Sequence, residues 1–439
     1  MLRAIREHKD SKSYKIARDA KDYYEHRNPT ITRYQNYIYN QMGQAVPDIW
    51  KPNHKIASNW FFYFTTQAVQ YLLGNGVSFA SEKTKNALGD DFDERVQDAA
   101  EKAKCSGVAF GYWNLDHLEI FDLLEFVPLF DEENGGLRAG IRFWQIDDKK
   151  PLRATLYELD GCTEYIKRET DDIEILRPKR PYKITVASTP KGGEEIIDGK
   201  NYAGFPIVPL WNINRQSDLV GNQGTIDAYD LMTSKLINNV SEGNFVYWVL
   251  KNCGGMDRVD DAKFVEQLMI SHVAHADGDD GAEVKDHTVE VPFEASEVAL
   301  KTLKEQLYHD FMALKVEEIA SGSVTATQIQ AAYEPINQKT DAFEPMVAAF
   351  IKGVLAIAGI DDVPTFTRSQ MSNQTELVDI VISAKQYLST NYVTSKILSL
   401  LGDIDKLETV LAEREEEDQS RFDAEQIDGE EDDEGGDGV

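Results

Sequence analysis

The sequence predicts an α+β fold in which helices and antiparallel strands occupy separate stretches of the chain. The hydrophobic period is close to two between about Val108 and Ile213, which is typical of strands, and it is helical before and after that stretch. A second observation is a pair of amphipathic helices, over 225–243 and from 296 onward, that flank a short strand-rich insertion. At ~100–200 residues per domain, 439 residues allow two to four domains, and a hydrophobic content of 42% lets them bury cores.

The charge balance and the cysteine count exclude several classes of protein. Lys and Arg number 46 against 76 Asp and Glu, so the net charge is −30, opposite to that of a protein that grips nucleic acid through its phosphates. No run approaches the ~20 apolar residues of a membrane span, and the N-terminus lacks the apolar region of a signal peptide. Cys105, Cys162 and Cys253 are widely spaced, which fits neither a disulfide framework nor a zinc cluster, so we expect the reducing cytoplasm.

The first part of the chain is expected to be helical. Residues 1–39 are charged, rich in tyrosine and helical in pattern. Residues 53–73 are strongly apolar and predict a well-buried helix, which Gly74-Asn75-Gly76 closes before a short strand. The aromatic cluster Trp60 to Phe64 within this run is expected to pack in the core. Another helix is predicted over 91–105, ahead of the antiparallel strands.

A stalk with a β tip is predicted in the middle of the chain. Strand-like sequences, FVYWVLKN at 245–252 and TVEVPFEA at 288–295, lie between the two amphipathic helices. The apolar residues expected to pack these two helices against each other are Ile226, Tyr229, Leu236, Leu303 and Leu307. Asp227, near the start of the first helix, is expected to complement the helix dipole, with contact to a second subunit as the alternative.

A long helix is predicted beyond the stalk, after a short segment of small and polar residues. That segment consists of Ala320, Ser321, Gly322, Ser323 and Val324. Thr325 then begins a helix in which Gln328 completes a capping box, and the pattern continues to about Ala358, roughly 50 Å if unbroken. Pro335 and Pro345 lie inside it, so we expect a kink or a break at these positions.

The C-terminal part is expected to be a small helical module followed by a tail. The helical pattern runs from about Thr375 to about Glu416. Residues 413–439 carry a net charge of −12 and few apolar side chains, so residues 417–439 are expected to be a disordered acidic tail.

No motif points to catalysis or to a bound cofactor. Phosphate-binding loops and nucleophile elbows are absent from the sequence, and no acidic pair can be singled out in so acidic a chain. His272 and His275 are spaced as metal ligands can be, but no third ligand is evident. The residues therefore favour a non-enzymatic assembly protein without a metal, with two alternatives: a metal-dependent enzyme centred on His272 and His275, and a monomeric assembly scaffold.

Four stretches, in this order, resemble the portal proteins of siphophages, the head-to-tail connectors of tailed bacteriophages. The stretches are HKIASNWFFYFTTQAVQYLLGNGVSF at 54–79, KCSGVAFGYWNLD at 104–116, GFPIVPLWNINRQSDLVGNQGTIDAYDLMTSKLINNVSE at 204–242, and SGSVTATQIQ at 321–330. Each motif by itself is weak, but their order is specific, and the resemblance covers roughly residues 14–415.

The resemblance implies a ring, usually of twelve subunits, around a DNA channel. It also implies a division of the chain into named regions. Residues 1–221 would form a wing of helices and antiparallel strands, 222–243 and 296–319 the stem helices, and 244–295 the clip. Residues 320–358 would form a tunnel loop and a kinked tunnel helix, which joins the wing, and 359–416 a helical crown. In this arrangement Ala320 to Val324 would face the DNA. Lys315 and Lys339 would either offset repulsion between the acidic channel and the DNA or be ordinary surface lysines.

The resemblance further implies a set of partners at one vertex of the virion. These are the major capsid protein, a scaffolding protein, the large terminase subunit, a head-completion (adaptor) protein, the tail, and double-stranded DNA that passes without sequence-specific binding. No cofactor and no membrane are expected, and synthesis would occur in the host cytoplasm. The clip strands are expected to pair between neighbouring subunits, and the docking surface is expected to include Tyr247, Trp248, Lys251, Asn252, Asp257 and Arg258.

Overall fold

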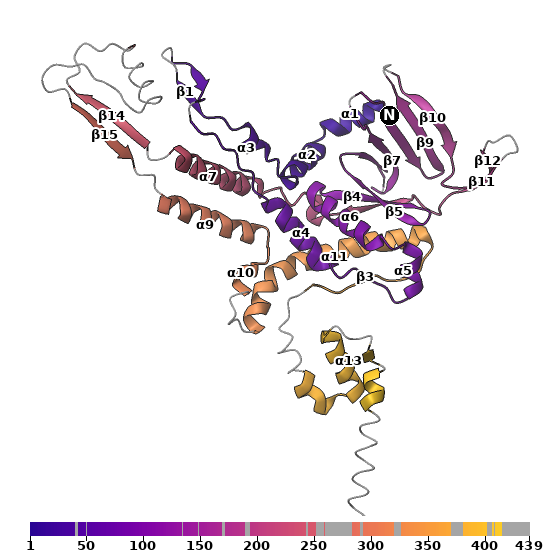
Figure 1. Cartoon of the computed structure of the whole chain (residues 1–439). Helices are drawn as coiled ribbons and strands as arrows, with labels where there is room; N and C mark the ends of the chain where they lie inside the picture. The colour runs from indigo at the N-terminus through magenta and orange to yellow at the C-terminus, as the bar shows by residue number, and fades with distance from the viewer. Residues whose placement is uncertain are drawn as a thin grey trace, which may run out of the picture. The chain divides into compact units, whose positions relative to one another are not determined.

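A computed structural model of the chain divides into two compact units, 1–369 and 370–439, and each is described by itself. The described residues are 1–39, 43–49, 51–133, 135–147, 149–168, 172–188, 194–242, 245–251, 259, 283–289, 293–319, 326–369, 381–401, 406–407 and 409–414. Helices and antiparallel strands both occur in the first unit, as the sequence predicted (Figure 1).

The N-terminal segment is helical and ends in a small hairpin. Its elements are α1 (Leu2–Asp10), α2 (Lys12–Tyr24), α3 (Pro29–Arg33), β1 (Tyr37–Tyr39) and β2 (Ala45–Pro47). The Ser11 hydroxyl accepts a hydrogen bond from the Tyr14 N–H and so begins α2. Pro29 occupies the first turn of α3, where its missing N–H costs nothing.

The buried aromatic helix is shorter than the sequence indicated. Helix α4 spans Trp60–Leu73, so the prediction of helix over 53–59 was wrong. Residues 53–58 lie outside any helix, and the N–H groups of His54, Ile56 and Ser58 are satisfied instead by side chains of a distant helix. Within α4 the aromatic cluster does pack in the core, since Phe61 and Phe64 are each only 1% exposed.

The antiparallel strands predicted between about Val108 and Ile213 form several separate sheets. Short elements precede them: β3 (Val77–Ser78), α5 (Glu82–Leu88) and α6 (Phe92–Ser106). The order β13-β4-β5 joins Ile207–Trp211, Val108–Asn114 and His117–Asp122. The order β10-β9-β8-β7-β6 joins Glu174–Arg180, Gly161–Lys167, Leu152–Glu158, Leu137–Trp144 and Phe126–Phe130. A separate hairpin pairs β11 (Lys183–Ser188) with β12 (Glu194–Lys200).

The main core lies between the first of these sheets and the helices that cover it. Helix α11 (Ala326–Ala358) packs against β13 and β4, and Phe343, Val347 and Phe350 of this helix are buried in the core cluster. Two glycines permit this close approach. A Cβ at Gly353 would lie 2.7 Å from a Val208 methyl, and one at Gly111 would lie 2.6 Å from the Phe350 ring.

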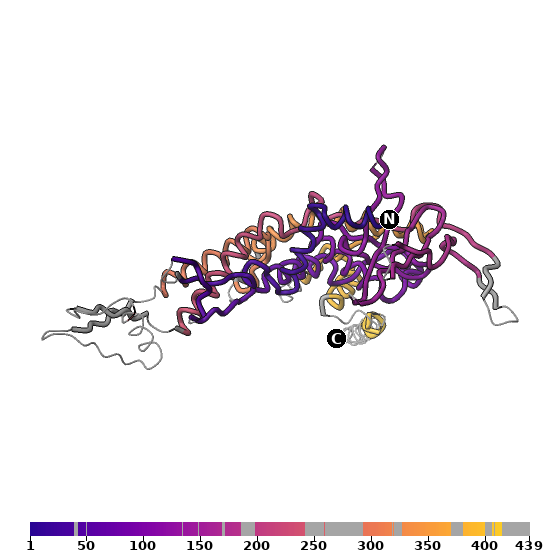
Figure 2. Tube along the Cα trace, turned by 90° about the horizontal axis from the view of Figure 1, so that it is seen from above, coloured from indigo at the N-terminus to yellow at the C-terminus, as the bar shows by residue number. Residues whose placement is uncertain are grey.

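Two helices run side by side (Figure 1, Figure 2), and a two-stranded element lies between them in sequence (Figure 1). They are α7 (Gln223–Glu242) and α9 (Phe293–Asp310), and between them in sequence β14 (Phe245–Lys251) pairs with β15 (Glu283–Val289). The second strand therefore lies earlier than the predicted 288–295, whose last residues belong to α9. The two strands pair with each other within one chain, with Phe245 opposite Val289.

The helix expected over 296–319 is interrupted. Helix α9 ends at Asp310, and the short α10 (Val316–Ile319) follows after a turn. The Met312 N–H bonds to the His309 carbonyl, the Ala313 N–H bonds to the Tyr308 carbonyl, and Met312 has a φ of 51°. This is the Schellman arrangement, which usually places glycine at the left-handed position.

Helix α11 is continuous from Ala326 to Ala358, so neither Pro335 nor Pro345 breaks it. It ends at Gly359, which has a φ of 78°. The chain then forms β16 (Thr365–Phe366), which pairs with β3. Residues 359–369, expected in the crown, thus belong to the first unit.

The second unit contains the 3₁₀ helix η2 (Ala384–Tyr387) and α13 (Thr390–Leu401) among its described residues. Val393 is buried there, and the Arg414 guanidinium donates a hydrogen bond to the Thr394 hydroxyl. The predicted tail, 417–439, lies outside the described residues. Within the part of the chain that the structure describes, no helix is long and apolar enough to cross a membrane.

Candidate functional site

A buried group of three charges joins α6, α11 and the turn that precedes α7. The Asp218 carboxylate lies 2.9 Å from Lys339 Nζ and 3.6 Å from Lys104 Nζ. The Lys104 side chain is only 1% exposed, and those of Lys339 and Asp218 are 10% and 11% exposed. The other Asp218 oxygen accepts a hydrogen bond of 2.7 Å from the Asn212 amide. We call Lys104, Asp218 and Lys339 the charge triad.

Each member of the charge triad has further contacts that hold it in place. Lys339 Nζ donates to the Phe311 carbonyl at 3.1 Å, which ties α11 to the end of α9. Lys104 Nζ lies 4.1 Å from the centre of the Phe343 ring, a cation–π contact within α11's buried face. The Asp218 N–H donates to the Lys104 carbonyl. The charge triad therefore fixes three separate parts of the chain relative to one another.

Burial and charge act in opposite directions on the charge triad. Burial by itself raises the pKa of Asp218, but Lys104, Lys339 and the Asn212 amide together outweigh it, so the Asp218 pKa is lowered. Burial lowers the pKa of Lys104 to about 8, although Asp218 opposes this shift. An ion pair in such a site is costly to desolvate, yet removing one partner costs more.

A second buried carboxylate, Asp230 on α7, is surrounded by neutral donors. Asp230 is fully buried and accepts hydrogen bonds from the Asn28 amide at 2.7 Å and from the Ser58 N–H at 3.0 Å. Burial raises the pKa of Asp230, and the hydrogen bonds from Ser58 and Asn28 only partly offset this. The neighbouring Asp227 accepts from Tyr23, Asn28 and Thr30.

The Asp227 contacts correct the expectation that this residue complements the dipole of its helix. Helix α7 begins at Gln223, so Asp227 lies beyond its first turn. Its carboxylate instead holds α2 and the start of α3 against α7.

An extended strap, defined as residues 53–58, runs along α7 and explains why 53–59 is not helical. The N–H groups of His54, Ile56 and Ser58 donate to the side chains of Asn238, Ser234 and Asp230, at 2.7, 3.0 and 3.0 Å. Two residues of extended chain advance ~6.6 Å and four residues of helix advance ~6 Å, so the two repeats match. Polar side chains spaced by four on α7 thus substitute for a neighbouring strand.

The residues predicted to pack the two long helices against each other are buried to different extents. Ile226 and Leu307 are buried in one hydrophobic cluster, 1% and 0% exposed, and Tyr229 packs against this cluster. Leu236 and Leu303 are half-buried.

The predicted tunnel residues are only partly described. Ala320 to Val324, and Thr325 with them, lie outside the described residues. Gln328 is exposed near the start of α11, and so is Pro345 farther along. Pro335 and Lys315 line a cavity of about 640 Å³ between the end of α9 and the first turns of α11.

Lys339 is not the channel-facing or surface lysine that the sequence suggested. It is buried in the charge triad, because Asp218 and the Phe311 carbonyl provide its partners inside the protein. Sequence reasoning missed Lys104, Asp218 and Asp230. The signal in the sequence was indirect: Asp218 and Asp230 lie in the stretch 204–242, and Lys104 begins the stretch 104–116, both of which carried the resemblance.

The predicted docking surface falls mostly outside the described side chains. Tyr247, Trp248 and Lys251 lie in β14, opposite His287, Asp286 and Glu283 of β15. Asn252, Asp257 and Arg258 lie outside the described residues, and so do His272 and His275.

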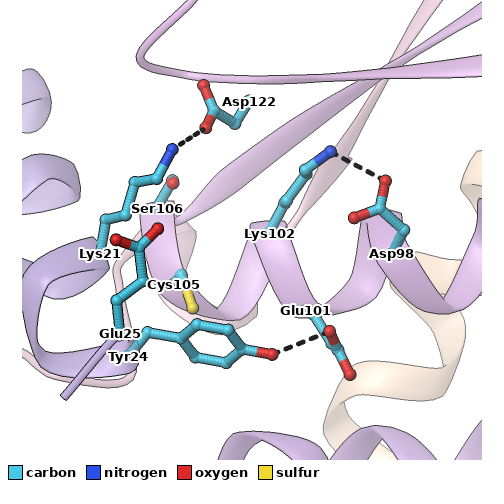
Figure 3. Close-up of a pocket in the computed structure, with 9 residues that line it drawn as sticks. All are labelled: Lys21, Tyr24, Glu25, Asp98, Glu101, Lys102, Cys105, Ser106 and Asp122. Atoms are coloured by element: carbon cyan, nitrogen blue, oxygen red, sulfur yellow. Dashed lines mark hydrogen bonds and ion pairs between the residues drawn. The ribbon is translucent and has the colours of Figure 1, made fainter. Parts of the chain in front are cut away.

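A polar pocket between α2 and α6 has a volume of about 260 Å³ (Figure 3). Most of its charged groups have a partner within it: Tyr24 donates to Glu101 at 2.9 Å, Lys102 to Asp98 at 2.8 Å, and Lys21 lies 3.7 Å from Asp122. Burial raises the pKa of Glu101, and the Tyr24 hydroxyl opposes that shift. Among the described residues, no group of three or more His, Cys, Asp or Glu side chains is arranged to hold a metal ion. The pocket presents no catalytic arrangement.

Comparison with known proteins gives one family. The family model "Phage portal protein, SPP1 Gp6-like" matches residues 4–420. The portal protein of Bacillus phage SPP1 is 25% identical over 383 residues, covering 80% of this chain and 74% of that protein. The portal protein of Clostridium phage phiCD119 is 24% identical over 409 residues, covering 85% and 87%.

Comparison with solved structures returns, among others, two necks of GTA particles. The neck of a native particle, computed with C12 symmetry, matches with 10% identity and a TM-score of 0.43, covering 78% of this chain and 90% of that chain. The neck of an empty particle, computed with C6 symmetry, matches with 8% identity and a TM-score of 0.42, covering 79% and 90%. Because the family model spans nearly the whole sequence, the chain belongs to the phage portal protein family of the SPP1 Gp6-like type.

Proposed function

We propose that copies of this chain form the ring at one capsid vertex of a tailed bacteriophage, through which double-stranded DNA enters during packaging and leaves during ejection. The observation that carries the proposal is the family match over residues 4–420. The arrangement of the first unit supports it, because a helix pair with a two-stranded tip projects from a body in which α11 packs on a sheet. The protein acts in assembly and has no catalytic role of its own.

The parts of the chain receive roles in this proposal. The roles are a wing at 1–221, a stem of α7 and α9, a clip at 244–295 around β14 and β15, a tunnel loop at 320–324, and a tunnel helix formed by α11. We assign the crown to residues 370–416, because 359–369 pair with the first unit through β16. Residues 417–439 form an acidic tail.

The clip is proposed as the docking surface for the packaging motor and then for the head-completion protein and the tail. Tyr247, Trp248, Lys251, Asn252, Asp257 and Arg258 are the residues proposed to form it. The body of the ring would contact the major capsid protein and a scaffolding protein during head assembly. The complete ring resides in the virion after synthesis in the host cytoplasm.

The charge of the chain suits passage of DNA rather than retention of it. Contacts that release counterions from phosphates produce tight, salt-dependent binding, which would trap a moving duplex. A net charge of −30 per subunit opposes such binding. The segment Ala320 to Val324, which faces the DNA in this proposal, offers small side chains and no charge.

Electron microscopy of the purified chain in negative stain, with light-scattering mass on the same sample, tests the proposal. Rings with a central hole and a mass of about 600 kDa, for twelve chains of 49.6 kDa, are expected. A chain that stays monomeric in the presence of its scaffolding protein would contradict the proposal. Stoichiometric metal in that monomer would then favour the enzyme centred on His272 and His275, and its absence would favour a monomeric scaffold.

A further inference from the structure

The hairpin β1–β2 exposes apolar side chains although it is anchored firmly. We define the arm as residues 33–55, which contain the hairpin and the start of the strap. The strap fixes the arm to α7 near Asn238, toward the end of that helix that leads to β14. Tyr37 and Ile49 are nevertheless 61% and 79% exposed, and Ile38 is 38% exposed.

An isolated pair of short strands with exposed apolar residues has little stability by itself. Among the described residues β1 pairs with β2 alone, so each strand has an open edge. Two-stranded hairpins are marginal in water unless another element covers them. Anchoring by the strap keeps the arm in position without covering its apolar side chains. A partner surface would cover these apolar side chains.

The outer face of α9 offers a surface that matches the arm. Val298 is 64% exposed and Phe293 is 46% exposed, so this face also has uncovered apolar groups. The strap packs on the α7 face that carries Asp230, Ser234 and Asn238, whereas α9 packs on another side of α7 (Figure 1). The two apolar surfaces are therefore separate within one chain.

The two surfaces also have opposite charge, which is unusual in a chain this acidic. The arm has a net charge of +2, with Arg33 and Lys55 both exposed. The exposed ionised residues along the outer face of α9 have a net charge of −2 and are Glu294, Glu297, Lys301 and Glu305. Subunits that each carry −30 repel one another, so a contact between copies is favoured where opposite charges meet.

We propose that the arm of one copy docks on the outer face of α9 in an adjacent copy. Two different surfaces that complement each other generate a head-to-tail contact, which closes into a ring when the rotation permits. The inference rests on the proposed ring and identifies one interface within it. Tyr37, Ile38 and Ile49 supply the apolar part on the arm, and Val298 and Phe293 supply it on α9.

A mixing experiment tests this interface with the full chain. The arm variant carries Tyr37→Ser and Ile49→Ser, and the α9 variant carries Phe293→Ser and Val298→Ser. Each variant alone should stay monomeric where the wild-type chain forms rings, whereas an equimolar mixture should give dimers and nothing larger, because one intact arm meets one intact α9 face. Mass photometry measures the products, and unchanged thermal unfolding of each variant shows that the fold is kept.

A charge-reversal pair provides a second measurement that does not depend on apolar residues. Lys55→Glu alone and Glu297→Lys alone should each weaken assembly at least threefold, and the double variant should recover most of that loss. Lys9→Glu, on an exposed residue of α1, is the matched control and should leave assembly unchanged.

The outcomes separate this inference from the proposed function. Wild-type rings together with normal rings from both serine variants and no rescue by the charge pair would overturn the interface and leave the ring proposal standing. A wild-type chain that never forms rings would overturn both. Dimers in the mixture, with rescue by the double charge reversal, would support both.

Discussion

Two buried aspartates twelve positions apart, Asp218 and Asp230, have opposite electrostatic surroundings. Asp218 lies between two lysines, and its pKa is lowered in spite of its burial. The hydrogen-bond donors to Asp230 are neutral, and the nearby charge is the carboxylate of Asp227, which is negative as well. The pKa of Asp230 is therefore raised by its burial. The residue type is the same and burial alone would raise the pKa of both, so the partners decide the sign of the shift.

The difference separates two ways of joining distant segments. The charge triad joins α11 and α6 to the turn before α7 with full charges, which makes loss of the shared Asp218 carboxylate costly. The Asp230 site holds the strap and the start of α3 with hydrogen bonds to neutral groups, which are weaker individually. The two sites should therefore respond differently to substitution and to pH.

The largest effect is expected from Asp218→Asn. The substitution leaves Lys104 and Lys339 buried without an opposite charge, and removal of one partner from a buried ion pair costs about 3–5 kcal/mol. The free energy of unfolding from urea titration measures this loss. Asp90→Asn, on an exposed residue, is the matched control and should change stability by less than about 0.5 kcal/mol.

If Asp218→Asn does not fold, a triple variant keeps the prediction testable. Asp218→Asn combined with Lys104→Met and Lys339→Met removes all three charges and should be more stable than Asp218→Asn alone. A triple variant as unstable as the single one would contradict the assigned role of the lysines.

Asp230→Ala should cost less, about 1–3 kcal/mol. The substitution leaves the Ser58 N–H and one of the two N–H groups of the Asn28 amide without an acceptor, since the other can still bond to Asp227, and this costs the desolvation of neutral polar groups. Denaturant unfolding measures the loss, and Asn238→Ala is a graded comparison because its bond to the strap is exposed. A loss for Asp230→Ala as large as that for Asp218→Asn would show that charge on the partners does not distinguish the sites.

The pH dependence of stability should differ in sign between the two sites. The lowered pKa of Asp218 contributes stability that is present above its unfolded value of about 3.9 and is lost as the pH falls through the folded pKa. The raised pKa of Asp230 contributes stability that is present below about 3.9 and is lost as the pH rises through the folded pKa.

Unfolding free energies of the wild type, Asp218→Asn and Asp230→Asn across the acid range isolate the two contributions. The difference between wild type and Asp218→Asn should grow as the pH rises, and the difference between wild type and Asp230→Asn should shrink. Parallel profiles for all three proteins would contradict the opposite signs.

The smallest effect is expected from Lys104→Met, at most about 1 kcal/mol. Lys339 remains 2.9 Å from Asp218, and an unbranched apolar side chain still packs against Phe343 while removing a charge with a pKa of about 8. Lys339→Met should cost more, since it also removes the hydrogen bond to the Phe311 carbonyl. Thermal unfolding orders the two variants, and equal losses would show that the lysines are equivalent.

Helix ends show how far the sequence allows prediction of local structure. Gly359 ends α11 close to the expected position because glycine adopts the left-handed conformation without strain. The equivalent position after α9 is Met312, which carries no such signal, so the helix was expected to continue to 319. At Pro335 and Pro345 the sequence predicted a kink or a break, and α11 is not broken at either; Phe343, Val347 and Phe350 of this helix are buried against the sheet.

The candidate site could not be predicted from the sequence because its residues lie far apart along the chain. Lys104 and Asp218 are 114 residues apart, and Lys339 is 121 residues farther on, so no local pattern could indicate that they meet. Residues 53–58 directly precede a strongly apolar helical run and were predicted as part of it. The prediction failed because the acceptors that bind their N–H groups lie on α7, far away in the sequence.

The sequence by itself determined the mixture of helices and strands, the paired long helices around a β tip, the acidic character and the family. Those properties depend on periodicity, composition and the order of motifs, all of which are local or additive. Only the tertiary structure decided which charges are buried together, which backbone groups the side chains of α7 satisfy, and which glycines let α11 approach the sheet. Each of these depends on contacts between segments far apart in sequence, where burial changes the energy of a charge or a hydrogen bond.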